Sequence, residues 1–178
     1  MKKLYTFIAF VFIYLNTFSQ SEMGINQIYA GYSLGYNIAA EVIKLAGESV
    51  DGKFGQFMLG YKTKIGKSRF SVGLHASFCS AYSTSTYDVS LFNFYSKFDY
   101  HWILNEKSDF YSGIGVGTSY FNIYDYTLNI NAPIKGNAVG IHINLIGYRH
   151  NFSKNFSEFI ELGFLNLGIV QIGLAYNL

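Results

Sequence analysis

The stretch Phe70-Ser-Val-Gly-Leu-His-Ala-Ser-Phe-Cys79 alternates apolar residues with small or polar ones, with a period of two. Successive side chains of a β-strand point to opposite faces, so this stretch predicts a strand with one apolar and one polar face. Val72 and Leu74 lie on the apolar face, whereas Gly73 and His75 lie on the other.

The same alternation recurs along the chain in segments of strand length, and it predicts eight strands in all. They are Gln27–Asn37, Gln56–Ile65, Phe70–Cys79, Phe92–Trp102, Gly113–Tyr120, Val139–Leu145, Phe159–Phe164 and Val170–Asn177. Each strand has one side of aliphatic and aromatic residues and one side of glycine, serine, asparagine and a few charges. The pattern predicts an all-β protein built from antiparallel hairpins.

Short and long connections alternate between these strands, as an up-and-down barrel with unequal ends requires. The short turns are Gly66–Ser68, Asn105–Ser108 and Asn151–Asn155, and the long connections are Ala39–Phe54, Ser80–Asp88 and Asn122–Gly136. An even number of strands places both chain termini at the end of the barrel that carries the short turns. The single proline, Pro133, lies in the third long connection, where it removes no hydrogen bond of the sheet.

The N-terminal segment Met1–Gln20 has the layout of a secretory signal peptide. Lys2 and Lys3 precede an apolar run that is shorter than a membrane-spanning helix needs, and Thr17 and Ser19 supply small residues for cleavage. We expect residues 1–19 to be removed as a signal peptide, with cleavage after Gln20 as the alternative, and residues 20–178 to form one barrel domain.

The composition of the two faces decides which of them lies inside. A soluble barrel exposes its polar face to water and crowds it with charged residues, yet only 13% of this chain is charged, and 19% is aromatic. Glycine and serine fit the narrow lumen of an eight-stranded barrel, and long apolar side chains fit lipid. The sequence therefore predicts an eight-stranded antiparallel up-and-down transmembrane β-barrel. The net charge of +2 without a basic stripe indicates no nucleic-acid partner.

The strand rhythm, the glycine-rich face and the last strand, Gly168-Ile-Val-Gln-Ile-Gly-Leu-Ala-Tyr-Asn-Leu178, resemble the small OmpX-like and OmpA-like outer-membrane barrels, especially those common in Bacteroidetes. The resemblance implies location in the outer membrane of a Gram-negative cell, contact with outer-membrane lipid, and recognition of the last strand by the barrel-assembly machinery. Leu178 departs from the aromatic residue usual at the terminus of that family, although Tyr176 keeps an aromatic on the same face.

Seven titratable residues are predicted to project into the lumen as a polar network: Lys62, Lys64, His75, Lys97, Asp99, His101 and Glu161. Opposite charges in a confined interior should pair, because an isolated charge there is costly. We interpret the network as a plug that closes the barrel, and the alternative is a narrow ion path. His75, His101 and His142 lie on different strands, so we expect hydrogen-bonded fillers and no metal site. Cys79 is interpreted as another small inner-face residue.

No nucleophile, base and orienting acid can be nominated together from the sequence, so we expect no catalysis and no cofactor. Lipid A palmitoyltransferases and deacylases resemble this scaffold, but no long connection here contains a histidine, and His150 and Ser153 are wrongly spaced. Loops on a rigid barrel often carry binding, so an extracellular ligand or partner protein is expected there. The sequence leaves three hypotheses, in this order: a structural or surface-interaction barrel, a narrow porin-like channel or transporter for small polar or hydrophobic solutes, and a lipid A-modifying enzyme.

Overall fold

A computed structural model describes residues 26–34, 38–45, 47–66, 68–83, 86–126, 133–165 and 169–178 of the chain. Its elements are β1 (Asn26–Leu34), α2 (Ile38–Leu45), β2 (Gly52–Lys64), β3 (Phe70–Tyr82), β4 (Tyr87–Leu104), β5 (Ser108–Asp125), β6 (Ile134–Asn151), β7 (Phe156–Leu165) and β8 (Val170–Asn177). The segment 1–19 expected to be a signal peptide lies outside the described residues. Within the described part, no helix has the length and apolar character that crossing a membrane requires.

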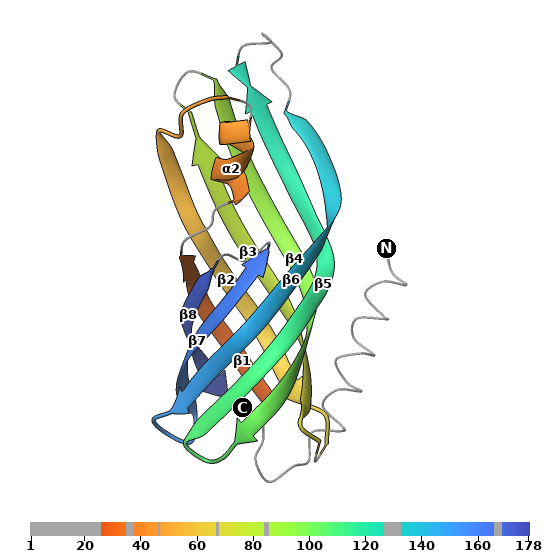
Figure 1. Cartoon of the computed structure of the whole chain (residues 1–178), viewed down its shortest axis with the longest axis vertical. Helices are drawn as coiled ribbons and strands as arrows, with labels where there is room; N and C mark the ends of the chain where they lie inside the picture. Colours follow the sequence, from red (N-terminus) through yellow and green to blue (C-terminus); the bar gives the residue numbers. More distant parts are fainter. Residues whose placement is uncertain are drawn as a thin grey trace.

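The eight strands form one closed antiparallel barrel in which each strand pairs with its neighbours in sequence, and β1 pairs with β8. Figure 1 shows the closed wall with the strands tilted to the barrel axis. Closure leaves no free edge along the part of the wall that all eight strands share, which is what a lipid environment demands of a sheet. The predicted fold class is confirmed.

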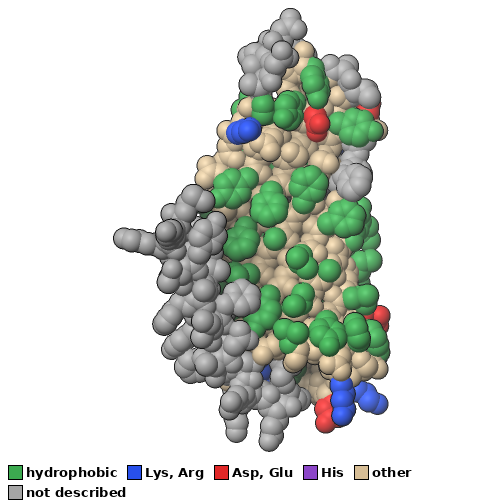
Figure 2. Space-filling model, turned by 180° about the vertical axis from the view of Figure 1, so that it is seen from behind, with side chains coloured by type: hydrophobic (Ala, Val, Ile, Leu, Met, Phe, Trp, Pro, Cys, Tyr) green, Lys and Arg blue, Asp and Glu red, His purple; other side chains and the backbone are tan. Residues whose placement is uncertain are grey.

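The outer wall of the barrel is apolar. Large apolar residues that alternate along the strands are exposed. Three examples, Leu59, Phe94 and Val116, are between 43% and 57% exposed. Figure 2 shows apolar side chains spread over the described part of the wall, with lysine, arginine and acidic groups toward the two ends. The complementary face holds the buried polar residues, so the predicted assignment of inside and outside agrees with the burial pattern.

The strands differ greatly in length. β4, β5 and β6 have 18 residues each, whereas β1, β7 and β8 have between 8 and 10. In Figure 1 the long strands reach the top of the molecule, and β1 and β7 end about halfway up. The barrel therefore has a low side, made by β7, β8 and β1, and a high side whose upper part stands clear of it.

Several predicted boundaries were wrong because the strands extend further than their clearest alternation. β5 begins at Ser108 and not at Gly113, and the connection predicted over 122–136 is shorter, since β5 continues to Asp125 and β6 begins at Ile134. The polar outer-face residues of these extensions, such as Asn122, gave no apolar signal to follow.

The connection predicted over Ala39–Phe54 contains the helix α2, which the search for strands missed. Ala39 and Ile43 of α2 are fully buried against Cys79 of β3 and Leu91 of β4. These residues are four positions apart and so lie on one face of the helix. α2 thus covers an apolar patch on the inner wall. Figure 1 shows α2 near the upper end of the barrel, where the long connections lie.

Candidate functional site: the charged belt in the lumen

Six charged side chains meet in the interior of the barrel, three positive and three negative, and we call them the charged belt. Its members are Lys62 of β2, Lys97 and Asp99 of β4, Asp109 of β5, Arg149 of β6 and Glu161 of β7. All six are buried, with at most 3% of each residue exposed. Burial of six charges is tolerable only because the belt is neutral and its members are paired.

The strongest contact of the belt joins Lys97 and Glu161, which lie on strands that are not neighbours. The Lys97 Nζ atom donates to both carboxylate oxygens of Glu161, at 3.0 and 2.9 Å. The hydroxyl of Tyr111 donates to the same carboxylate at 2.8 Å. Because β4 and β7 face each other across the lumen, this ion pair bridges the interior from wall to wall.

A second ion pair joins Lys62 and Asp99, on either side of β3. The Lys62 ammonium also lies 4.1 Å from the centre of the Tyr111 ring, a cation–π contact. Tyr111 therefore contacts both ion pairs and links them through one ring.

A third group of contacts closes the short-turn end of the lumen around Asp109. Its carboxylate lies 2.6 Å from Nδ1 of His101 and accepts a hydrogen bond from Arg149 at 3.0 Å. The other ring nitrogen of His101 lies 2.9 Å from the Ser71 hydroxyl. All four residues are at most 3% exposed.

Ser71, His101 and Asp109 stand in the order that activates a serine nucleophile in hydrolases. Sequence reasoning missed this trio, because it began the fifth strand after Asp109. The Ser71 hydroxyl, however, belongs to a residue that is only 1% exposed, and its neighbours fill the interior. In this geometry the trio joins three strands and presents no surface to a substrate.

The other predicted network residues lie apart from the belt. His75 is buried higher in the lumen, where its Nδ1 atom lies 3.0 Å from the hydroxyl of Tyr29. Lys64 is half-buried at the short-turn end, and none of the contacts found among the described residues joins it to the other charges. The sequence thus named residues of the correct face, and the structure brings only some of them together.

Histidines and cysteine lie where the alternation predicts, on the inner face. His142 lies 3.3 Å from the Gln171 amide, and Cys79 is buried under α2. In the part of the chain that the structure describes, no group of three or more His, Cys, Asp or Glu side chains is placed to hold a metal ion.

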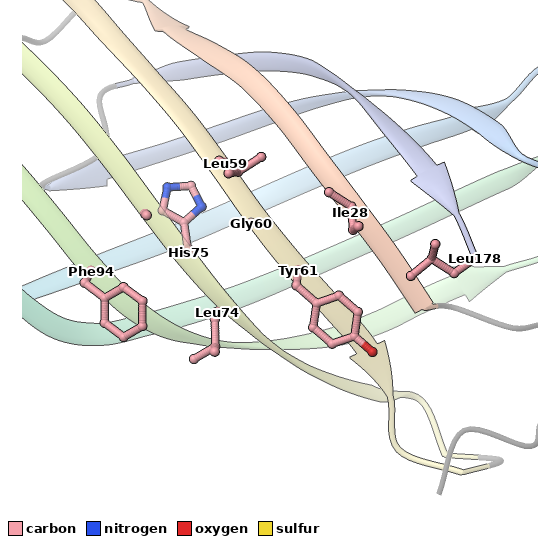
Figure 3. A pocket seen from close by; sticks show the side chains of 9 residues that line it. Ile28, Leu59, Gly60, Tyr61, Leu74, His75, Phe94 and Leu178 are labelled. Atoms are coloured by element: carbon pink, nitrogen blue, oxygen red, sulfur yellow. The ribbon is translucent and has the colours of Figure 1, made fainter. Parts of the chain in front are cut away.

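The outer wall also carries apolar hollows. One of about 380 Å³ lies over β1 to β4 and is lined by lipid-facing residues such as Ile28, Leu59 and Leu74, which Figure 3 shows around it. The lining contains no acidic or basic side chain apart from His75. An apolar depression of this kind fits a hydrocarbon environment and not an aqueous substrate.

A closed eight-stranded antiparallel barrel with an apolar wall and a polar, ion-paired interior is the fold of the small OmpA-like and OmpX-like outer-membrane barrels. No family model matches the chain, and no curated protein matches its sequence. Solved structures match its fold.

Neisserial surface protein A (NspA) matches at a TM-score of 0.53 with 9% identity, covering 86% of this chain and 95% of that one. The Yersinia pestis outer membrane protein Ail, determined in a phospholipid bilayer nanodisc, matches at 0.51 with 13% identity, covering 86% and 98%. The N-terminal β-barrel domain of Pseudomonas aeruginosa OprF gives 0.48 with 14% identity, covering 86% and 98%. At these identities the likeness concerns the fold.

Proposed function

We propose that this protein is an exported barrel of the outer membrane, without catalytic activity, that meets an extracellular partner through its high side. Residues 1–19 would direct export, and the short turns would face the periplasm. The lumen, in this proposal, is closed by the charged belt below and by α2 above. The barrel then serves as a rigid support for what it displays outside the cell.

The observation that carries the surface role is an edge of β6 that pairs with no strand in the part of the chain that the structure describes. Residues 134–141 of β6 pair with β5 on one side, but the pairing of β6 with β7 ends at His142 and Leu165 among the described residues. The edge belongs to the high side of the barrel (Figure 1). A free strand edge is a template for pairing with an extended segment of another protein.

The side chains along this edge suit strand addition. Val139 is 79% exposed and Ile134 is 54% exposed, so the edge offers apolar contacts as well as backbone groups. Lys135 is exposed and is the only charged residue of the segment 134–141. Charged side chains on an edge discourage pairing with another strand, and this edge has only the one at Lys135.

Proline substitution tests this role, because proline removes the backbone donor that an added strand needs. We expect a fluorescent peptide of alternating valine and threonine to bind the barrel in vesicles. Neighbouring residues of a strand point their N–H groups to opposite sides, so either Ala138→Pro or Val139→Pro must block the free edge. The blocking variant should lose peptide binding.

A heat-modifiability gel, in which a folded barrel migrates differently before and after boiling, checks that each proline variant still folds. Ile28→Val, on the low side, is the matched control and should bind the peptide as the original protein does. If both proline variants fold and bind the peptide as well as the original protein does, the role of the edge is refuted.

A closed lumen should not conduct ions, and this distinguishes the proposed barrel from the channel hypothesis. The Lys97–Glu161 contact crosses the interior, and side chains fill an eight-stranded barrel. We therefore expect purified protein to give no steady conductance in planar bilayers. Reproducible open-channel currents would favour a narrow channel for small solutes instead.

A further inference from the structure

A second, larger hollow on the outer wall runs across β6, β7, β8, β1 and β2 and measures about 780 Å³. It exists because a small residue lies at its centre. Ala30 faces outward between Leu59 and Leu174 on the neighbouring strands, and the adjacent pair Gly31 and Gly173, whose positions face the lumen, contributes only backbone. The larger residues Tyr32 and Ile172 border the depression.

The hollow has one charged group in its lining, the carboxylate of Glu158. Glu158 is exposed on the outer face of β7, two residues from the start of that strand and next to the short turn 152–155. A carboxylate at the edge of an apolar wall is costly unless a cation or polar donor meets it. Basic groups flank it: His150 is its partner in the pairing with β6, and Lys154 is exposed in the turn.

We propose that this hollow binds one phospholipid with a primary ammonium headgroup, of the phosphatidylethanolamine class. An acyl chain lies along Ala30 and the glycine pair, and the ammonium group donates hydrogen bonds to Glu158. His150 and Lys154 lie on the side where the lipid phosphate would stand. The volume is within the range that holds a small organic ligand. The inference rests on the membrane location proposed above.

Native mass spectrometry of the full folded barrel tests the site. The protein is released from micelles that contain equal amounts of phosphatidylethanolamine and phosphatidylglycerol with identical acyl chains. We expect a one-lipid adduct that favours phosphatidylethanolamine roughly fivefold, as one charge-assisted hydrogen bond allows. Glu158→Gln should bring the two lipids to parity.

Two further variants separate the headgroup from the chain. Ala30→Phe fills the hollow and should reduce the adducts of both lipids, with Ala30→Leu as the smaller change if phenylalanine impairs folding. Glu106→Gln removes an exposed carboxylate at another short turn and should leave the preference unchanged.

Equal binding of both lipids by the original protein, or an unchanged preference in Glu158→Gln, would overturn the proposal. A lipid-free dimer would also overturn it, because a second copy would then cover the hollow. Recovery of the barrel from cells without detergent would instead refute the membrane location itself, so the two failures are distinguishable.

Discussion

Glu161→Ala is expected to destabilise the folded barrel by about 3–5 kcal/mol, because it leaves the buried ammonium of Lys97 without its partner. The Tyr111 hydroxyl loses its acceptor in the same change. Urea titration of the barrel in lipid vesicles, followed by Trp102 fluorescence, measures the free energy of unfolding.

Glu106 provides the control for this experiment. It is exposed in the short turn between β4 and β5, so Glu106→Ala should change the free energy of unfolding by less than about 1 kcal/mol. The double variant Lys97→Met with Glu161→Leu should recover most of the lost stability, since an apolar pair can replace a buried ion pair. A Glu161→Ala barrel as stable as the original would show that the belt contributes nothing.

Val116→Arg is expected to cost about 2–4 kcal/mol, the range for a cation on the lipid face near the middle of a bilayer. Val116 lies midway along β5, and 48% of it is exposed on the apolar wall. The same urea titration measures the effect. If the wall faced water, the arginine would be tolerated, and an unchanged stability would reverse the assignment of inside and outside.

Asn122→Arg is the control for the lipid-facing arginine. Asn122 is exposed on the outer face of the same strand, six residues further along, where β5 approaches the long-loop end. An arginine there reaches water or headgroups, so its cost should fall to between zero and about 1 kcal/mol. The difference between the two positions then maps the depth of the hydrocarbon region.

The alternation of residues was sufficient to predict the closed barrel and the contents of its two faces, because one face forms the apolar outer wall and the other lines a narrow interior. It also placed His101 and Glu161 inside. Asp109 and Tyr111 were missed although they continue the phase of Gly113 backward, because the predicted strand began only at Gly113 and left residues 109–112 unassigned.

Arg149 was missed for a different reason, which is a β-bulge. The pairing of β6 shifts between Asn144 and Ile146, so Leu145 and Ile146 both face outward, and the phase changes beyond them. Without the shift, Arg149 would lie on the apolar outer wall; with it, Arg149 reaches Asp109. β4 has a similar β-bulge, at which Trp102 and Ile103 both face outward. At both bulges two adjacent large apolar residues face outward, which breaks the alternation that the strand prediction follows.

The helix α2 could not be predicted from strand alternation, since the buried apolar side chains that the structure describes in it, Ala39 and Ile43, are four positions apart and not two. Its position depends on the inner wall of β3 and β4, which is apolar at that height. Tertiary packing, and not local propensity, decides such a short helix.

The unequal strand lengths bear on how the molecule assembles. Hairpins among β3, β4, β5 and β6 join neighbours in the chain through long ladders, so they are entropically the easiest contacts to form. The seam between β1 and β8 joins residues as far apart as Gln27 and Asn177, 150 positions along the chain, through the shortest strands of the molecule. Closure of the cylinder is therefore the step with the greatest chain-entropy cost, with only short strands to offset it, and it is where a helper that holds the two terminal strands together would accelerate biogenesis most.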